Sequence, residues 1–344
     1  MDIQSAIAKV IDGGSLNTSD MVDVMRQIMT GECTDAQIAG FLVALRIKGE
    51  TVEEITGAAK VMRELALPVS VRGEHLVDIV GTGGDGTSIF NVSTASTFVA
   101  AAAGCKVAKH GNRSVSSNSG AADLLETAGV RLDINPEQVA RCIEHVGVGF
   151  MFALNHHSAM RFAIGPRKEL ATRTLFNLLG PITNPAGVKN QLLGVYSKEW
   201  VRPIAEVLRD LGSEHILVVH SADGLDEISI ARETYVAELN AGEITEYVIT
   251  PEQFGIERGG LDDLKVTDSK ESLALIKTLL SGAESSAADI VALNAGAAIY
   301  AANVASSLKE GVSIAQDILG SGAGLEKLNE LVQVTQVMKE SSSL

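Results

Sequence analysis

The chain has 344 residues, of which 46% are hydrophobic and only 4% aromatic, with 33 glycines against 7 prolines. The length suits two domains, and the composition predicts an α/β protein whose core rests on Ala, Val, Leu and Ile. The formal net charge of −15 makes the surface acidic and argues against a general nucleic-acid-binding surface.

Residues 1–70 are predicted to form a small all-helical domain. Two capping boxes mark helix starts within it, Thr34 with Gln37 and Thr51 with Glu54. The stretch between them, AQIAGFLVALRIKG, is apolar on more than one face, which predicts a helix buried between neighbours. We expect this helical domain to provide the contact surface of a homodimer.

From residue 71 onward, the pattern predicts strands that alternate with Ala-rich helices. Strands are expected at 76–80, 105–109 and 216–220, and helices at 93–103, 120–128 and 289–304. This alternation predicts a large α/β domain, residues 71–167 and 188–344, with a central, mostly parallel sheet flanked by helices. Ligands are expected at the carboxyl ends of its strands. The apolar segment at about 168–187 is expected to cross back to the helical domain.

The cysteines and the N-terminus predict a soluble cytoplasmic protein. Cys33, Cys105 and Cys142 are widely spaced and odd in number, which is typical of reduced, buried thiols. The first ten residues, MDIQSAIAKV, lack the basic and apolar regions of a signal peptide. No apolar run approaches the length that spans a bilayer, so we expect no membrane association.

The loop GTGGDG, 81–86, has the GxGxxG spacing of a dinucleotide-binding turn. That interpretation requires an acidic residue after the next strand, where this chain has Lys-His at 109–110. Asp85 would also repel a pyrophosphate unless a cation or a sugar hydroxyl lay between them. Residues 91–94, Asn-Val-Ser-Thr, are capping residues at a helix start, where backbone N–H groups bind anions. The loop is therefore predicted to bind a phosphate ligand other than a dinucleotide.

A second segment, KHGNRSVSSNSG at 109–120, places cations and hydroxyls between a strand end and a helix start. Lys109 and Arg113 are the cations, and four serines follow them closely. Such groups at a helix N-terminus predict a second anion cradle. A solvated polar loop is the alternative interpretation.

A third segment, DGLDEIS at 223–229, follows the buried strand ILVVH and holds two adjacent carboxylates, Asp226 and Glu227. Such a pair suits a Mg²⁺ ion that also binds substrate phosphate. An ordinary acidic turn is the alternative, and the two nearby phosphate cradles favour the metal.

A fourth segment, NHHSAMRFAIGPRKEL at 155–170, contains Arg161 and Arg167, which could face one side of a helix that Gly165-Pro166 interrupts. An arginine without an acidic partner in sequence can bind a substrate carboxylate with two hydrogen bonds, although a surface arginine is equally compatible with the pattern. The pair His156-His157 lacks a third ligand at a metal-site spacing, so local packing and hydrogen bonding are expected for it.

These stretches, GTGGD, KHGNRSVSS, FNLLGPITNPA and DGLDE, resemble the anthranilate phosphoribosyltransferase family over nearly the whole chain. The resemblance implies a homodimer formed through the helical domain, and an α/β domain that binds 5-phosphoribosyl 1-pyrophosphate (PRPP) with Mg²⁺. It implies that PRPP is bound by Gly81, Gly84, Asp85, Asn91, Val92, Ser93, Thr94, Lys109, His110, Gly111, Asn112, Arg113, Ser114, Val115, Ser116 and Ser117.

The same resemblance assigns the remaining site residues. Anthranilate would meet Gly81, Asn112 and Arg167, with His110 along its path; Mg²⁺ would be held by Ser93, Asp226 and Glu227; and Lys109, Arg113 and His110 would act in catalysis. The implied reaction, a step of tryptophan biosynthesis, displaces pyrophosphate from C1 of the ribose by the amine of anthranilate.

Two positions depart from the usual family pattern. Ile89 stands where Thr or Ser is usual, with Thr87 and Ser88 close by, and Ser158 stands where Pro often follows His157. Two alternative functions remain open at this point. A pyrimidine nucleoside phosphorylase would use phosphate as its nucleophile and need no metal carboxylates, and a non-catalytic relative that binds nucleic acid would need a basic groove.

Overall fold

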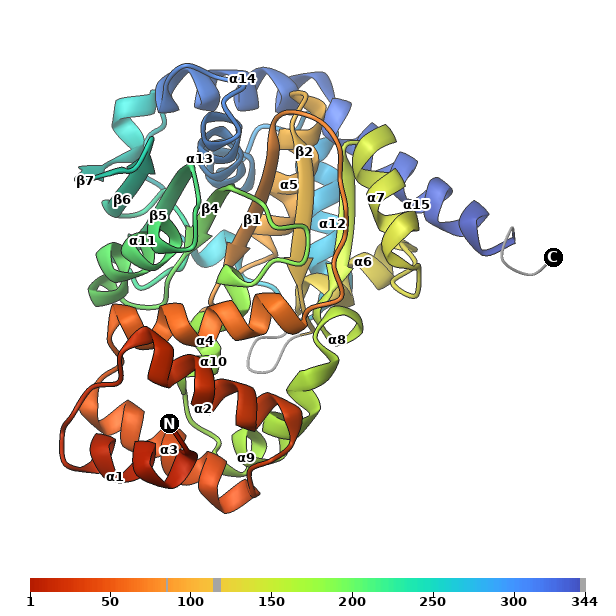
Figure 1. Ribbon diagram of the computed structural model, residues 1–344. Coiled ribbons are helices and arrows are strands. Elements are labelled where there is room, and N and C mark those ends of the chain that lie inside the picture. Colours follow the sequence, from red (N-terminus) through yellow and green to blue (C-terminus); the bar gives the residue numbers. More distant parts are fainter. Residues whose placement is uncertain (85, 114–118, 341–344) are drawn as a thin grey trace.

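The computed structural model describes residues 1–84, 86–113 and 119–340. A group of helices from the N-terminal end lies against one end of a larger part that is built around a β-sheet (Figure 1). Helix α15 (Ala323–Glu340) extends away from that larger part toward the C-terminus.

The N-terminal part is helical, as predicted. It consists of α1 (Ile3–Ile11), α2 (Thr18–Thr30), α3 (Asp35–Lys48) and α4 (Val52–Leu65). Both predicted capping boxes form, at the starts of α3 and α4. The Thr side chain accepts a hydrogen bond from the backbone three residues on, and the Gln or Glu side chain accepts one from the cap residue.

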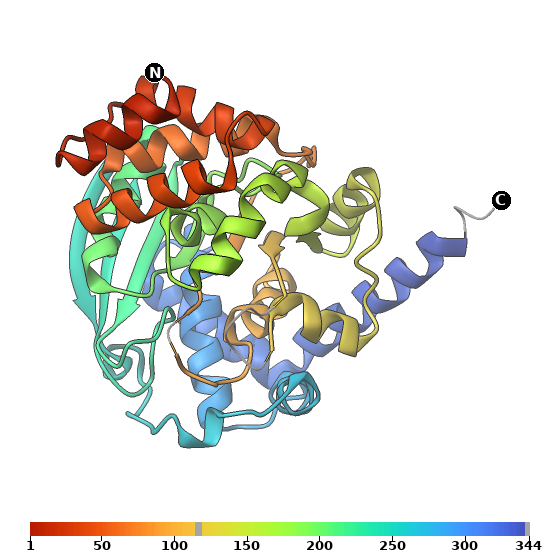
Figure 2. The ribbon, with the colours of Figure 1, turned by 90° about the horizontal axis from the view of Figure 1, so that it is seen from below.

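Two later helices pack against this bundle. Helix α9 (Arg161–Leu170) contacts α2 and α3, and α10 (Leu175–Leu179) contacts α3 and α4. Figure 2 shows the red and orange N-terminal helices beside the yellow-green helices near residue 160. The interruption predicted at Gly165-Pro166 is wrong, because α9 continues through both residues. The predicted domain boundaries, with their crossover at about 168–187, stay a prediction.

The larger part contains a seven-stranded sheet with the order β3-β2-β1-β4-β5-β6-β7. Its strands are β1 (Leu76–Gly81), β2 (Lys106–Gly111), β3 (Val148–Phe152), β4 (Asn190–Gly194), β5 (His215–Ser221), β6 (Thr234–Asn240) and β7 (Glu243–Ile249). The pairs from β3 to β5 are parallel, and β6 and β7 pair antiparallel at one edge. The predicted mostly parallel sheet is confirmed.

Helices cover both faces of the sheet because its central strands are apolar on both sides. On β5, Leu217 and Val219 belong to the core beneath α5 (Val92–Ala102) and α13 (Ser286–Ala301). Ile216 and Val218 face the opposite way, toward α11 (Val201–Asp210) and the N-terminal bundle. The remaining α-helices are α6 (Ala121–Ala128), α7 (Pro136–His145), α8 (Ala153–His156), α12 (Ser269–Leu280) and α14 (Leu308–Ser321).

The apolar helices belong to these cores, and no helix in the described ranges is long and apolar enough to cross a membrane. Cys105 and Cys142 are buried free thiols, as predicted, whereas Cys33 is only half-buried. The cytoplasmic location stays a prediction.

Candidate active site

The glycine loop follows the carboxyl end of β1, where Asp226 packs closely against the backbone. A Cβ on Gly81 would lie 2.3 Å from Oδ2 of Asp226, so a larger residue there would displace the Asp226 carboxylate. Gly83 and Gly84 follow with φ angles of +65° and +75°, which favour glycine. Asp85 lies outside the described residues. Because α5 begins only at Val92, the loop lacks the strand-to-helix turn of a dinucleotide site, as predicted.

The start of α5 presents groups suited to an anion. Asn91 precedes the helix, but its side chain bonds to Ser119 and Ser272 instead of capping the helix. The N–H of Val92 donates to the carbonyl of Phe90 at 2.8 Å, and those of Ser93 and Thr94 are left without a side-chain cap. Oγ1 of Thr94 is buried and has no hydrogen-bond partner among the described residues. Together these donors suit a phosphate or pyrophosphate oxygen.

Lys109, near the end of β2, is the buried cation of the site. Its side chain is only 3% exposed, and Nζ donates to the carbonyl of Ile79 at 2.7 Å and to Oγ of Ser93 at 3.3 Å. Burial lowers the pKa of Lys109, and the charges of Asp78 and Glu227 oppose that shift. The ammonium therefore lies between the end of β1 and the start of α5.

His110 and His157 form a buried pair beside Lys109. Their ring centroids lie 5.1 Å apart, and burial lowers the pKa of His110 to about 3 and that of His157 to about 4. Both rings are therefore neutral near pH 7. Within the described part of the chain, Nε2 of each ring has no hydrogen-bond partner. His156 instead makes the predicted local contact, with Nδ1 2.9 Å from the carbonyl oxygen of Leu67.

The residues after His110 are only partly described. Gly111 is needed because a Cβ there would lie 2.9 Å from the ring of Phe150, and Asn112 is exposed. Arg113 points to α6, where its guanidinium donates to Asp123 at 3.0 Å and to Glu126 at 2.5 and 2.8 Å. These carboxylates raise its pKa. The other predicted PRPP residues of this loop, Ser114 to Ser117, lie outside the described residues.

The predicted metal carboxylates lie at the carboxyl end of β5. Asp226 is 9% exposed, and its Oδ2 accepts a hydrogen bond from the N–H of Gly83 at 2.7 Å. A Cβ on Gly194 would lie 1.6 Å from the backbone oxygen of Asp226, so β4 and this loop are in close contact. Glu227 is close enough to act on the charge of Lys109. The carboxylate pair, the glycine loop and the buried lysine thus lie together at the carboxyl ends of the central strands β1, β2 and β5.

These groups fit one kind of metal site. No group of three or more His, Cys, Asp or Glu side chains that could hold a metal occurs among the described residues. Mg²⁺ typically binds through one or two carboxylates, with substrate phosphates and waters completing its shell. The pair Asp226–Glu227 beside a phosphate loop fits that arrangement and does not fit an ion enclosed wholly by protein ligands.

The two arginines of α9 differ in their surroundings. Arg167 is half-buried, with its guanidinium 5.2 Å from the ring centroid of Phe176, and burial lowers its pKa. Arg161 is exposed and lies 4.6 Å from the ring centroid of Phe162. Arg167 is therefore the arginine of this pair with a recessed position suited to a bound carboxylate.

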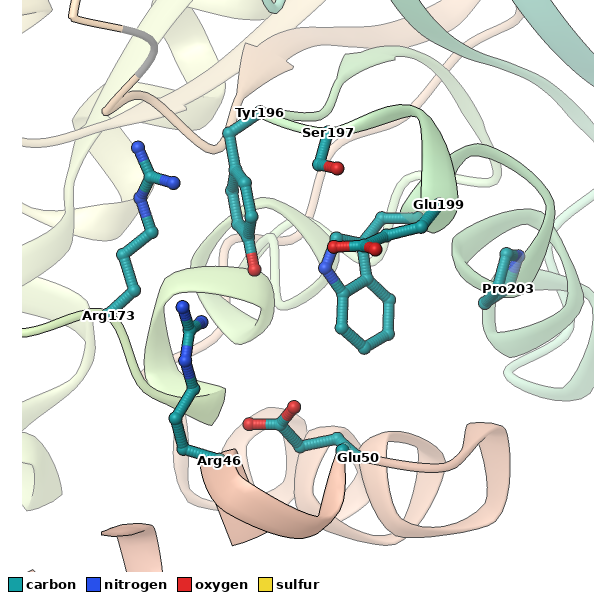
Figure 3. Close-up of a pocket in the computed structure, with 9 residues that line it drawn as sticks. Arg46, Glu50, Arg173, Tyr196, Ser197, Glu199 and Pro203 are labelled. Carbon is teal, nitrogen blue, oxygen red and sulfur yellow. The ribbon is translucent and has the colours of Figure 1, made fainter.

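Sequence reasoning missed Arg173, which donates a hydrogen bond to the carbonyl of Gly84 in the glycine loop. Its guanidinium lies 4.4 Å from the ring centroid of Tyr196, at the edge of a cavity of about 650 Å³. Figure 3 shows Arg173 beside Tyr196, with Arg46 and Glu50 facing them from the end of α3. A lone arginine in the apolar run TRTLFNLLGP gave no signal of this contact.

The structure shows the contacts of Ile89 and the exposure of Ser158, the two positions that depart from the usual family pattern. Ile89 forms an isolated antiparallel bridge with Lys265, and its side chain packs against the core of the larger part. An apolar residue at this position is therefore explained by packing. Ser158 is exposed and begins a short 3-10 helix, Ser158–Met160, directly after His157.

Comparison with known proteins agrees with this architecture. A family model described as the α/β domain of a glycosyl transferase family matches residues 73–325, and the helical bundle domain of that family matches residues 4–66. The chain is 60% identical over 346 residues to the anthranilate phosphoribosyltransferase of Marinomonas sp. (strain MWYL1), with all of both chains covered. The chain belongs to the anthranilate phosphoribosyltransferase family.

Solved structures of anthranilate phosphoribosyltransferases have the same fold. The crystal structure from Thermus thermophilus has a TM-score of 0.91 and 47% identity, covering 96% of this chain and 99% of that one. The structure from Saccharomyces cerevisiae in complex with PRPP and Mg has a TM-score of 0.88 and 29% identity, covering 97% and 98%. These relatives support a phosphoribosyltransferase and not a pyrimidine nucleoside phosphorylase. The absence of a nucleic-acid partner stays a prediction.

Proposed function

We propose that this chain transfers the 5-phosphoribosyl group of PRPP to the amine of anthranilate, forming N-(5-phosphoribosyl)anthranilate and pyrophosphate. One observation carries the proposal beyond family membership. A glycine loop with an uncapped helix start, a buried lysine and a carboxylate pair meet at the carboxyl edge of the parallel sheet. Such an edge is where α/β folds bind phosphorylated ligands.

Lys109 and the start of α5 would hold the pyrophosphate. The ammonium is fixed by Ile79 and Ser93, so it meets developing negative charge without first reorganising. The N–H groups of Ser93 and Thr94 and the hydroxyl of Thr94 would donate to further phosphate oxygens. As the bond from C1 to the pyrophosphate oxygen breaks, its electron pair leaves with the pyrophosphate, and these donors stabilise that charge.

Mg²⁺ is the proposed cofactor. Asp226 and Glu227, with Ser93, would hold it, and support comes from the yeast relative whose structure contains PRPP and Mg. When bound, the ion would neutralise charge on the pyrophosphate. Asp226 would hold the ion while its Oδ2 accepts the hydrogen bond of the Gly83 N–H, which ties metal binding to the position of the glycine loop.

Anthranilate is the proposed acceptor, with Arg167 binding its carboxylate and Gly81 and Asn112 contacting the ring. The amine supplies the electron pair of the new C1–N bond and then loses one proton to water or to the departing pyrophosphate. We assign no strong general base, because His110 is a neutral, weakly basic imidazole in this site. The neutral rings of His110 and His157 would serve as uncharged walls and hydrogen-bonding groups along the acceptor's path.

A role for Arg113 in stabilising pyrophosphate requires its guanidinium to leave Asp123 and Glu126. All three side chains are partly exposed, so water screens these ion pairs and the exchange is not costly. Lys109 is therefore the main side chain that stabilises the negative charge of the departing pyrophosphate, and Arg113 contributes less.

A homodimer through the helical part is proposed as the assembly. Ile11 and Ile47 are 68% and 81% exposed, although both lie on helices whose other faces form the core of the bundle. A second copy of the chain would cover them. Sedimentation of the wild-type chain should give the mass of a dimer and Ile47→Glu that of a monomer, whereas a monomeric wild-type chain would contradict the proposed assembly.

The activity is tested by incubating the chain with PRPP, anthranilate and MgCl₂ and following the fluorescence of anthranilate. The proposal predicts that the fluorescence falls, that product with the mass of N-(5-phosphoribosyl)anthranilate accumulates, and that chelation of Mg²⁺ stops the reaction. Anthranilate that stays unconsumed while PRPP is intact would refute the proposal.

A further inference from the structure

A buried carboxylate on β1 lies just before the glycine loop and has no role in the reaction described above. Asp78 is fully buried, and burial raises its pKa to about 6 despite the charge of Lys109. Burying an acid costs free energy unless it is paired and hydrogen-bonded. Its oxygens accept from the N–H of His110 at 3.2 Å and from Nδ2 of Asn184 at 2.7 Å.

Asn184, the partner of Asp78, also hydrogen-bonds to the backbone of β2. Its Nδ2 also donates to the carbonyl of Ala108 at 2.8 Å, and its Oδ1 accepts from the N–H of Ala186 at 2.8 Å. The amide is 5% exposed and uses both hydrogens and its oxygen. Asn184 belongs to the stretch FNLLGPITNPA, which contributed to the family resemblance and to which no chemical role has so far been assigned.

These side chains lie where β1 and β2 separate. The two strands pair through Leu76 with Lys106 and Val77 with Val107, and the ladder ends there. Beyond that point, β1 stays paired with β4 as far as Gly81, and β2 stays paired with β3 as far as Gly111. The sheet therefore opens between its two neighbouring strands directly below the site.

Side chains replace the missing ladder bonds across this opening. Asp78 reaches from β1 to the N–H of His110, Lys109 reaches from β2 to the carbonyl of Ile79, and Asn184 bridges both strands. Backbone groups of the segment that carries Asn184, at Gly180 and Thr183, act to raise the pKa of His110 and of His157 against the effect of burial. Its Ile182 carbonyl accepts from Arg63 of α4 at 2.9 Å, so it is anchored to the bundle.

We propose that Asp78 and Asn184 are positioning residues that hold β1 and β2 apart at a fixed spacing, so that the glycine loop and Lys109 meet the same PRPP molecule. The inference rests on the proposed function. A side chain that fixes Lys109 and the N–H of His110 determines whether both phosphate-binding segments reach one ligand. Preorganisation of this kind lowers the cost of binding, so its loss raises the Kd for PRPP.

The test compares Asp78→Asn, Asn184→Asp and the double variant. Asp78→Asn leaves one oxygen for two donors, Nδ2 of Asn184 and the N–H of His110, and Asn184→Asp opposes two carboxylates, so each single change breaks at least one of these hydrogen bonds. The double variant restores one donor and one acceptor with the roles exchanged. Loss of a buried hydrogen bond with its partner left unsatisfied corresponds to about 1–3 kcal/mol, or about five- to 150-fold in an equilibrium constant.

The readout is the Kd of PRPP with MgCl₂, measured by calorimetry on protein shown to be folded, together with the thermal midpoint. Glu238→Gln is the matched control, because Glu238 is an acid of β6 that accepts from Tyr247 and Tyr300 at 2.7 Å, strands away from the opening. We expect both single variants to raise the Kd about tenfold or more and the double variant to recover part of that loss. Glu238→Gln should lower the midpoint and leave the Kd unchanged.

A Kd for Asp78→Asn equal to that of the wild type would overturn the inference. A rise in the Kd of Glu238→Gln as large as that of Asp78→Asn would overturn it too. If Asp78→Asn does not fold, Asn184→Ala is measured in its place and judged by the same two outcomes. Wild-type chain that fails to consume anthranilate refutes the proposed function. Wild-type chain that does consume it, with unaffected variants, refutes only the positioning role.

Discussion

Lys109→Met removes the buried positive charge of the site while keeping a side chain of similar length. In the wild-type chain the ammonium donates to the carbonyl of Ile79 at 2.7 Å and lies in the fields of Asp78 and Glu227. After the change, Asp78 keeps its hydrogen bonds but loses its cation, so its pKa rises further. The carbonyl of Ile79 loses a donor.

The expected magnitudes follow from these contacts. A hydrogen bond to a charged group contributes about 1.5–3 kcal/mol, so losing the contact of Lys109 with a phosphate oxygen should weaken PRPP binding by about 10- to 150-fold. The buried Asp78 carboxylate loses a favourable nearby charge and the carbonyl of Ile79 loses its donor, and part of this cost is offset because the lysine no longer has to be buried. We therefore expect the free energy of unfolding to fall by about 1–3 kcal/mol.

Calorimetric titration with PRPP and MgCl₂, beside urea unfolding, measures both effects. Lys106→Met is the matched control, since Lys106 begins the same strand at its opposite end and donates to the carbonyl of Arg72 near the surface. The control should leave PRPP affinity unchanged. Wild-type affinity in folded Lys109→Met, or an equal loss in Lys106→Met, would refute the assignment of Lys109 to the PRPP site.

Three further predictions concern metal, acceptor and pH. Asp226→Asn combined with Glu227→Gln should abolish Mg²⁺-dependent turnover, measured as the response of the initial rate to MgCl₂. Arg167→Ala should mainly raise KM for anthranilate, by about tenfold or more through the lost charged hydrogen bonds, whereas Arg161→Ala should leave it unchanged. The pKa of His157 is about 4 in the folded chain against an ordinary 6.5, so the unfolded chain binds the extra proton between these values and stability falls as the pH falls. His157→Gln should flatten that slope by up to about 1.4 kcal/mol per pH unit, measured by urea unfolding.

Each of these predictions has a result that contradicts it. For the metal, Asp262→Asn with Asp263→Asn removes an adjacent, exposed acid pair and should keep the response to MgCl₂. Loss of the response in both double variants would mean that the effect is not local to the predicted site. Equal KM values in the two arginine variants, or an unchanged pH slope in His157→Gln, would contradict the other two.

The sequence predicts the elements that have strong, continuous patterns. The run ILVVH identifies β5, and capping boxes identify α3 and α4, because both signals depend on neighbouring residues. Strand β4 was missed because NQLLG is too short to distinguish from a piece of helix. The β6–β7 hairpin, whose strands are joined at Ala241-Gly242, was also missed.

The site divides in the same way. The glycines of the loop and the helix start at 91–94 are predictable because the turn and the helix are encoded in neighbouring residues, whereas the side chain of Asn91 bonds to Ser119 and Ser272 instead of capping the helix. Asp78 and Asn184 are 106 positions apart in the chain, and only the fold brings them together. The sequence predicts that Arg113 meets an anionic ligand, whereas in the structure it pairs with Asp123 and Glu126 of α6.

The central claim is that the converging loops transfer a phosphoribosyl group from PRPP to an amine. The most direct measurement is the stoichiometry of the reaction, with pyrophosphate followed by ³¹P NMR and anthranilate by fluorescence in the same sample. The account predicts one pyrophosphate released for each anthranilate consumed, with both changes dependent on Mg²⁺. Pyrophosphate release without consumption of anthranilate, or no reaction of either compound, would contradict it.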